Sequence, residues 1–393
     1  MVIAVIVILV FCCFFMSGCG KGDDKATDAA KATSAAKATT EETQAQATEP
    51  IATVFFASDY QQMDGWPAPA ETLKGILSTV SESEKEPETF AFLGDYTNDA
   101  NLHDYQLSPE DSVDEIRSVL DEIYPGGGDP VFVQGNHDRM TESLTETGLH
   151  EYNDYLIYVL NTQEDFPWKQ GSTYGCLSKV KKSSGEMKKC FDELIARGEK
   201  RPVFIAGHVP LHYTARTSSR HTTGDNLYSS LIFDVVNEAG KNLDIVYLFG
   251  HNHSKGWDCY VGGSTTYKGV GETVLIPDYD ENSITTDKFT EETLAFTYMN
   301  AGYTGYYMNC GPTELAAGAL DQYRATDETL TGSVIQIWPD RLVINRYSPE
   351  GLHQLSGEGA ADPYKGGIDS DLIDPKHYSR QVDSPAAVER KNK

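Results

Sequence analysis

Positive charge is scarce in this chain. Lysine and arginine together number 32, against 59 aspartate and glutamate residues, so the formal net charge is −27. Because binding to a nucleic-acid backbone rests on clustered lysine and arginine, the composition argues against nucleic acid as the main partner. Any phosphate group that this protein binds would need a local source of positive charge, which a metal ion can supply.

The N-terminal apolar run, residues 2–16, is shorter than the about 20 residues that a membrane-spanning helix needs, but it suits the apolar region of an export signal. Met16-Ser17-Gly18-Cys19 resembles the lipobox of bacterial lipoproteins. That resemblance implies a signal peptide over residues 1–18 and a lipid on Cys19 that anchors an extracytoplasmic protein to the cell membrane. No lysine or arginine precedes the run, which departs from the pattern. An uncleaved anchor or a buried apolar segment is the alternative.

Cysteine is also sparse, with seven residues in the chain. Outside the N-terminal region the sequence has Cys176, Cys190, Cys259 and Cys310. Four cysteines allow two disulfides in three pairings, and free buried thiols are the alternative. Their spacing resembles no zinc motif.

Two segments lack the apolar content of a folded core. Residues 19–50 have almost no branched apolar or aromatic side chains, which predicts a disordered tether. Residues 351–393 are rich in glycine, aspartate and proline, which predicts an acidic, loosely ordered tail. We read its aspartates as surface charge, since the glycine and distal glutamate of a calcium-binding loop are missing. Internal repeats are absent too, which argues against an adhesive surface protein.

Between these segments, residues 51–350 alternate apolar strands with amphipathic helices. This pattern predicts an α/β fold with a mainly parallel sheet that is covered on both faces. Short strands after residue 273 predict a second, more antiparallel sheet packed on the first. We therefore expect two packed mixed β-sheets flanked by helices. The expected strands are 53–58, 90–94, 131–134, 155–160, 203–206, 245–249, 273–276, 294–299, 332–338 and 341–347, and the expected helices are 67–83, 108–120, 184–198 and 228–239.

Five of the apolar strands end in side chains that can carry chemistry. Gly135-Asn136-His137-Asp138 alone would also fit a polar turn, but four further strand ends carry similar groups. Because the carboxyl ends of parallel strands meet at one edge of a sheet, we expect a site there. The groups are Asp59 and Gln61, Asp95 and Asn98, Asn136 to Asp138, His208, and His251 and His253.

The donor set mixes carboxylate, amide and imidazole groups without a thiolate. Such a set suits divalent first-row metals better than calcium, which prefers oxygen ligands throughout. It also lacks the cysteines typical of structural zinc. The number of donors is enough for two ions.

In this order and on these strand ends, the motifs resemble those of the calcineurin-like metallophosphoesterase superfamily, over residues of about 51 to 350. The resemblance implies hydrolysis of a phosphomonoester or phosphodiester at two ions of manganese, iron or zinc, with magnesium as a further option. It implies one ion on Asp59, Gln61 and His253, another on Asn136, His208 and His251, and Asp95 between them. His137 would stabilise the transition state or protonate the leaving group, with Asn98 or Asp138 orienting its ring.

Gln61 departs from the family pattern, which has histidine at this position. An amide oxygen is a weaker and harder ligand than imidazole, so we expect looser binding there and a shift toward manganese, magnesium or iron. Gln62 is the alternative ligand, although strand alternation points it away. The departure also supports a second hypothesis: a surface lipoprotein that binds phosphorylated ligands without turnover.

Further candidates remain open on the sequence alone. His212 either contacts substrate or belongs to the pocket structure. Tyr303 to Tyr307 either line the pocket or pack in the core. Four cationic side chains either bind a second charged part of the substrate or are solvated loop charges. These are Arg139, Arg216, Arg220 and His221.

Overall fold

The computed structural model describes residues 48–61, 69–97, 109–128, 130–138, 140–162, 177–211, 230–251, 267–277, 289–305, 330–349, 351–352 and 379–382. All of them belong to the compact unit Ala47–Lys393. Among these residues, no helix combines the length and the apolar character needed to cross a membrane. The expected signal peptide and nearly all of the expected tether lie outside the described residues.

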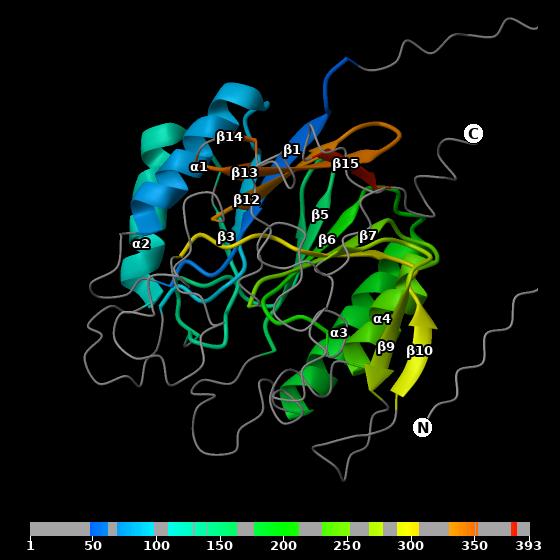
Figure 1. Cartoon of the computed structure of the whole chain (residues 1–393). Helices are drawn as coiled ribbons and strands as arrows, with labels where there is room; N and C mark the ends of the chain where they lie inside the picture. The colour runs from blue at the N-terminus through cyan, green and yellow to red at the C-terminus, as the bar shows by residue number, and fades with distance from the viewer. Residues whose placement is uncertain are drawn as a thin grey trace, which may run out of the picture. The chain divides into compact units, whose positions relative to one another are not determined.

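The first sheet has the strand order β14-β13-β12-β1-β2-β3, with β15 paired to β13 (Figure 1). Strands β1, β2 and β3 run parallel, whereas β12 is antiparallel to β1. The carboxyl ends of β1, β2 and β3 therefore lie at one edge. The strands are β1 Ala52–Ala57, β2 Thr89–Phe92, β3 Val131–Phe132, β12 Gly332–Ile337, β13 Leu342–Ser348, β14 Gly351–Leu352 and β15 Ser379–Val382.

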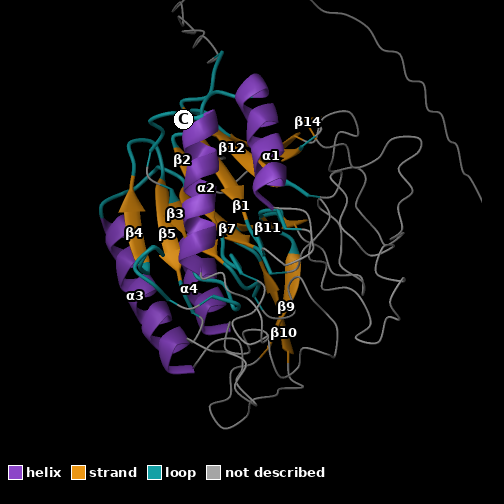
Figure 2. Ribbon diagram, turned by 90° about the vertical axis from the view of Figure 1, so that its left-hand side faces the viewer, coloured by secondary structure: helices purple, strands orange, loops and turns teal. Residues whose placement is uncertain are grey.

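The second sheet has the order β4-β5-β6-β7-β11-β8. Strands β5, β6, β7 and β11 run parallel, and the outer strands β4 and β8 are antiparallel to their neighbours. β9 Thr273–Pro277 and β10 Phe289–Thr293 form a separate antiparallel pair (Figure 2). The six strands are β4 Gly148–Glu151, β5 Leu156–Leu160, β6 Val203–Gly207, β7 Ile245–Phe249, β8 Tyr267–Lys268 and β11 Thr297–Asn300.

Strand alternation explains how the layers pack. In β1, Val54 and Phe56 belong to the core between the two sheets, whereas Phe55 and Ala57 pack with the first two helices. Phe56 meets Phe204 of the second sheet edge-on, with ring centroids 5.5 Å apart. The residues of one strand thus enter two different apolar layers, as a period of two dictates.

Four helices flank the sheets. Helices α1 and α2 pack on the outer face of the first sheet, and α3 and α4 pack on the outer face of the second (Figure 1). The predicted architecture of two packed mixed sheets flanked by helices is therefore confirmed. The helices are α1 Pro69–Ser83, α2 Pro109–Ile123, α3 Leu177–Ala196 and α4 Ser230–Gly240.

The predicted division of strands between the sheets is wrong. We expected the N-terminal strands in one sheet and the strands after residue 273 in another, but each sheet contains both kinds. β12 and β13 extend the first sheet antiparallel beside β1, and β11 joins the second beside β7. Two short segments of the expected loose tail, β14 and β15, also pair with β13.

Candidate metal centre

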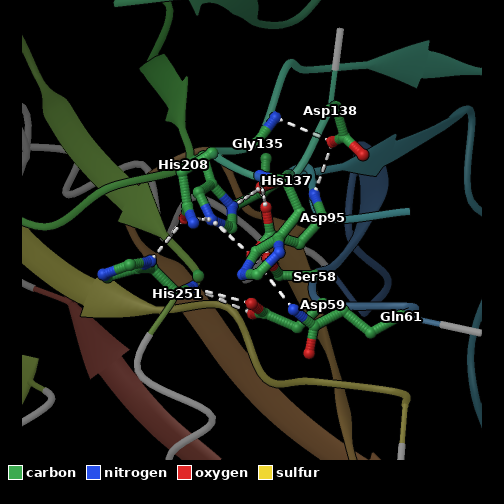
Figure 3. Close-up of polar contacts among 12 residues, drawn as sticks. Ser58, Asp59, Gln61, Asp95, Gly135, His137, Asp138, His208 and His251 are labelled. Atoms are coloured by element: carbon green, nitrogen blue, oxygen red, sulfur yellow. Dashed lines mark hydrogen bonds and ion pairs between the residues drawn. The ribbon is translucent and has the colours of Figure 1, made fainter. Parts of the chain in front are cut away.

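The described site residues come from strand ends of both sheets. Asp59, Asp95, Asn136 and His137 follow β1, β2 and β3 of the first sheet, while His208 and His251 follow β6 and β7 of the second. Figure 3 shows these segments meeting at one place, with hydrogen bonds and ion pairs between them. The predicted convergence of strand ends is thus present, and it occurs at the junction of two sheets.

The backbone at these strand ends is unusual. Across the described ranges, four non-glycine residues have a positive φ: Asp59 (53°), Gln61 (34°), Asp95 (57°) and His251 (63°). All four are predicted ligands. A left-handed conformation costs a non-glycine residue about 1–3 kcal/mol, and such strain concentrates at functional sites. The strain therefore marks independently the residues that the motifs had singled out.

Glycine precedes the site residue at several strand ends because there is no room for a side chain. A Cβ on Gly135 would lie 2.1 Å from the backbone nitrogen of Asp95, and one on Gly250 would lie 1.7 Å from Ser58 Oγ. Both distances are far below van der Waals contact. These glycines allow strand ends of neighbouring elements to approach closely enough to share a site.

Asp138 holds the neighbouring turn. Its carboxylate accepts hydrogen bonds from the backbone N–H groups of Asp95 (2.7 Å), Tyr96 (2.9 Å) and Gly135 (2.9 Å). Burial, helped by the charge of Asp95, raises the pKa of Asp138 to about 7. This carboxylate therefore fastens the loops after β2 and β3 together. Of the two residues expected to orient the His137 ring, Asp138 accepts these backbone N–H groups, and Asn98 lies outside the described residues.

Asp95 is the carboxylate at the centre of the cluster. Its Oδ2 lies 3.1 Å from His208 Nε2, and its Oδ1 accepts the backbone N–H of His137 at 2.9 Å. Burial pushes the pKa of Asp95 upward, but the imidazoles of His208, His137 and His251 together outweigh it and hold this pKa below its usual range. Asp95 is therefore ionised and available to a cation at neutral pH.

Asn136 Oδ1 lies between two imidazole nitrogens. His208 Nδ1 donates to the carbonyl oxygen of Leu93, which turns Nε2 toward Asn136 Oδ1 at 2.9 Å. His251 Nδ1 lies 2.6 Å from the same oxygen. Asn136 Oδ1 can accept hydrogen bonds from both imidazoles when these nitrogens carry hydrogens, and the three atoms can share a cation when they do not. The donor set fits a metal ion.

The protonation of His208 also indicates that this place favours a positive charge. Burial lowers the pKa of His208, but Asp95 outweighs it and raises that pKa to about 9. In the metal-free protein, a proton on His208 therefore occupies the place of a cation. Asp95, His208 and His251 each also offer one ligand atom within 4.8 Å of the others.

Gln61 reaches the same cluster. Its Nε2 donates to Asp95 Oδ2 at 3.3 Å. Its Oε1 is buried and has no hydrogen-bond partner among the residues that the structure describes. An unpaired buried amide oxygen is costly, and a cation would satisfy it. Its predicted partner His253 and the alternative ligand Gln62 lie outside the described residues.

Among the side chains of Asp95, His137 and His208, that of His137 is the most accessible. Its side chain is 14% exposed, compared with 2% for Asp95 and 1% for His208. Its Nε2 lies 3.8 Å from Asp95 Oδ2. A substrate can therefore reach His137, whereas the other two are enclosed.

Sequence patterns missed one contact of a predicted ligand and one further contributor to the centre. Asp59, a predicted ligand, also accepts the backbone N–H of His251 with both carboxylate oxygens, at 3.0 and 2.9 Å, and so positions that residue. The carbonyl oxygen of Leu93 orients the His208 ring, and no sequence motif marks a backbone carbonyl.

The remaining candidates are resolved in part. Tyr303 is buried, which favours core packing for this tyrosine. Cys190 is a free, half-buried thiol. The other candidates lie outside the described residues: Arg139, Cys176, His212, Arg216, Arg220, His221, Cys259, Tyr306, Tyr307, Cys310, Asp369, Asp371 and Asp374.

The fold is mixed α/β, and its strand ends bring imidazole, carboxylate and amide donors together. These features are those of a metal-binding α/β protein. The model of the family described as calcineurin-like phosphoesterase matches residues 52–255, just over half of the 393 residues. The chain therefore belongs to the calcineurin-like phosphoesterase family. It is a metallophosphoesterase, and its reaction is the metal-dependent hydrolysis of a phosphate ester.

Comparison with solved structures finds distant similarities. A dimetal phosphatase from Danio rerio is 11% identical, covers 77% of this chain and 97% of its own, and has a TM-score of 0.45. Purple acid phosphatase PPD1 from yellow lupin (Lupinus luteus) is 12% identical, with coverages of 76% and 52% and a TM-score of 0.44. Vps29 from Chaetomium thermophilum is 13% identical, with coverages of 76% and 90% and a TM-score of 0.29. No curated protein matches the sequence, so the family match carries the identification.

Proposed function

We propose that this protein hydrolyses a small phosphomonoester or phosphodiester outside the cytoplasm, through a centre of two metal ions. The observation that carries the proposal is the convergence of Asp95, Asn136, His208 and His251 donor atoms at the junction of the two sheets. All of these residues lie within the segment that matches the family.

The ligand assignment follows the donor atoms. Asn136 Oδ1, His208 Nε2 and His251 Nδ1 would hold one ion, and Asp59, Gln61 and His253 the other, with Asp95 between them. Such ions would hold the phosphoryl oxygens, stabilise the charge that develops on them and lower the pKa of water. Manganese, iron and zinc suit the mixed donors, and the amide of Gln61 also admits magnesium.

His137 acts on the substrate in this proposal. Its side chain is the accessible one, and its backbone N–H is fixed by Asp95 Oδ1. From that position the imidazole donates a hydrogen bond to the phosphoryl group or a proton to the leaving oxygen. The enclosed positions of Asp95 and His208 suit them to holding a cation.

The location outside the cytoplasm rests on the sequence. The apolar run over residues 2–16 and the lipobox-like segment ending at Cys19 support export and a lipid anchor on the membrane. A net charge of −27 weakly repels polyanions and favours a small substrate, although screening beyond about 10 Å keeps this preference slight.

Binding of phosphorylated ligands without turnover is the second candidate function. Gln61 favours it, because this residue replaces an imidazole ligand of the family pattern and its amide nitrogen donates to Asp95. The accessible His137 and the left-handed backbone at Asp59, Asp95 and His251 favour the enzyme, since both are features of a site kept for chemistry.

The test is hydrolysis of paired monoester and diester chromogenic substrates by the full chain, stripped of metal and then resupplied with manganese, iron, zinc or magnesium. We expect turnover that depends on metal and is lost in Asp95→Ala. The substrate with the higher kcat/KM identifies the ester class. Metal binding without turnover for any metal would replace the enzyme with the binding protein.

A further inference from the structure

The 300–305 loop, which we define as the last residue of β11 and the five residues after it, touches the strand end that carries Asp59. The backbone N–H of Thr304 donates to the carbonyl oxygen of Ser58 at 3.0 Å, and the N–H of Gly305 donates to that of Asp59 at 2.8 Å. The loop therefore extends the hydrogen bonding of β1 at the point where the chain turns into its left-handed conformation.

The same loop holds the strand end that carries His251. The N–H of Ala301 donates to the carbonyl oxygen of Phe249 at 2.8 Å, and Asn300 Nδ2 donates to that of Gly250 at 3.3 Å. β1 and β7 belong to different sheets. One loop thus bonds the ends of two strands that share no ladder.

The side chain of Asn300 is buried, and its amide group both donates and accepts a hydrogen bond. While Nδ2 donates to Gly250, Oδ1 accepts the N–H of Gly302 at 2.8 Å. Gly302 has a φ of 99°, and a Cβ there would lie 2.4 Å from the carbonyl oxygen of Thr331. The amide of Asn300 therefore joins the turn of the loop to the residue before His251.

Arg346 of β13 secures this loop from the first sheet. Its Nη2 donates to the carbonyl oxygen of Asn300, and its Nη1 donates to Thr331 Oγ1 at 3.3 Å. Ser333, its partner across the ladder, donates through Oγ to the carbonyl oxygen of Ala301 at 2.8 Å. Both sheets are thereby tied to one loop at the edge where the candidate ligands lie.

A guanidinium is a costly choice at this position. Arg346 is completely buried, and Leu342 and Ile344, which alternate with it on β13, lie in the core between the sheets. Removing a charged group from water costs several kcal/mol, and a well-packed apolar residue is often at least as stable. What Arg346 adds is position, because its rigid guanidinium donates hydrogen bonds in fixed directions to the loop and to Thr331.

We propose that Asn300 and Arg346 are positioning residues that hold Asp59 and His251 at the separation that bound metal requires. This inference rests on the proposed metal centre. Neither residue touches the candidate donor atoms in the contacts described above; they act through the 300–305 loop, which holds the carbonyl groups of Ser58, Asp59 and Gly250. Residues that support metal ligands in this way typically change metal affinity when they are replaced.

The test is calorimetric titration of the metal-free full chain with Mn²⁺, alongside urea unfolding of the same metal-free samples. We expect Asn300→Ala and Arg346→Met to weaken Mn²⁺ binding by about ten- to a hundredfold. Asn345→Ala is the matched control, because Asn345 is the neighbour of Arg346 and its side chain donates to Glu84 Oε1 beside α1. We expect it to lower the unfolding midpoint while Mn²⁺ affinity changes by less than about twofold.

The outcomes of this experiment separate the positioning role of Asn300 and Arg346 from the existence of the metal centre. Unchanged Mn²⁺ affinity in Asn300→Ala and Arg346→Met would overturn the positioning role, as would an equal loss in Asn345→Ala. If Arg346→Met does not fold, Asn300→Ala and Arg346→Lys decide the question, with an intermediate affinity expected for the lysine variant. A wild-type chain that binds no Mn²⁺ would instead overturn the metal centre itself.

Discussion

His137 shows how much of this site depends on the position of a single side chain. Its backbone N–H is bound to Asp95, while its imidazole is the exposed part of the cluster. These two features separate the contact that holds the loop, which belongs to the backbone, from the proposed role toward substrate, which would belong to the ring.

His137→Ala therefore tests the ring alone. Because the backbone N–H remains, we expect the variant to keep its metal while kcat falls by about 100- to 10,000-fold, the usual contribution of a positioned acid. Steady-state kinetics with a chromogenic ester and metal analysis of the same sample make the measurement. Loss of bound metal would show that His137 is a ligand.

Gln61→His tests the departure from the family pattern. Histidine is among the residues enriched at positive φ, so the backbone at 34° accepts it. An imidazole is a stronger ligand, and we expect the weaker of two Mn²⁺ equivalents to bind at least about tenfold tighter and the preference to move toward zinc. Calorimetric titration with each metal measures both. If wild type and Gln61→His have the same Mn²⁺ affinity and the same metal preference, Gln61 does not weaken metal binding.

Among the secondary-structure elements, helix α3 differs most from its expected start. We expected a helix from about residue 184, but it begins at Leu177 and runs through Ser183-Ser184-Gly185. Glycine within a helix costs about 1 kcal/mol, whereas full burial of Val180 contributes about 1.5–3 kcal/mol. Val180 and Met187 are both fully buried on the second sheet, and this tertiary contact outweighs the local signal.

The turn from α3 to β6 carries a charge network that predicts a pH dependence. Glu199 accepts hydrogen bonds from Arg201, which overcome the effect of burial and lower its pKa below the ordinary value. A lowered folded pKa means that the stabilisation is present above the unfolded pKa of about 4.3 and is lost as pH falls below it. Stability should therefore decline on the acid side.

Glu199→Gln should reduce the free energy of unfolding by about 1 kcal/mol at pH 7. The difference from wild type should persist above pH of about 4.3 and shrink below it, because Glu199 then takes up a proton in the unfolded chain while it is still ionised in the folded one. Urea unfolding at several pH values measures it. Glu186→Gln is the control: its partner Lys182 is 3.8 Å away on an exposed helix face, and such pairs contribute little. A difference that does not change with pH would contradict the charge network.

At the scale of the whole molecule, the centre joins two sheets that otherwise meet through apolar packing. Asp59, Asp95 and Asn136 come from one sheet, and His208 and His251 from the other. A bound ion would therefore cross-link the sheets and offset buried carboxylate charge. Global stability and metal occupancy should be linked for this reason.

Metal loading should accordingly raise the melting temperature. A ligand at 100 times its Kd stabilises the folded state by about 2.7 kcal/mol, which corresponds to several degrees in Tm. Differential scanning calorimetry with Mn²⁺ and with chelator measures the shift, and Asp95→Asn should reduce it. The same Tm with Mn²⁺ and with chelator would contradict a centre that bridges the sheets.

The sequence by itself determined the class of fold and the described candidate ligands. Apolar strand periodicity, helix periodicity and polar strand ends are local signals, and strands β1, β2, β5, β6 and β7 lie within about two residues of where these signals place them. The ends of parallel strands meet at one edge, so Asp59, Asp95 and Asn136 could be grouped without coordinates, whereas His208 joins them because the two sheets meet at this edge.

Only the tertiary structure decided which strands share a sheet and what holds the ligands. Strands of both sheets are covered on two faces, so all read as similar apolar runs, and nothing local separates β11 from β12. The contributions of Asp138, Asn300 and Arg346 depend on hydrogen bonds between residues about 40 or more positions apart. Such bonds leave no period in a sequence, because their partners become neighbours only after the two sheets have packed.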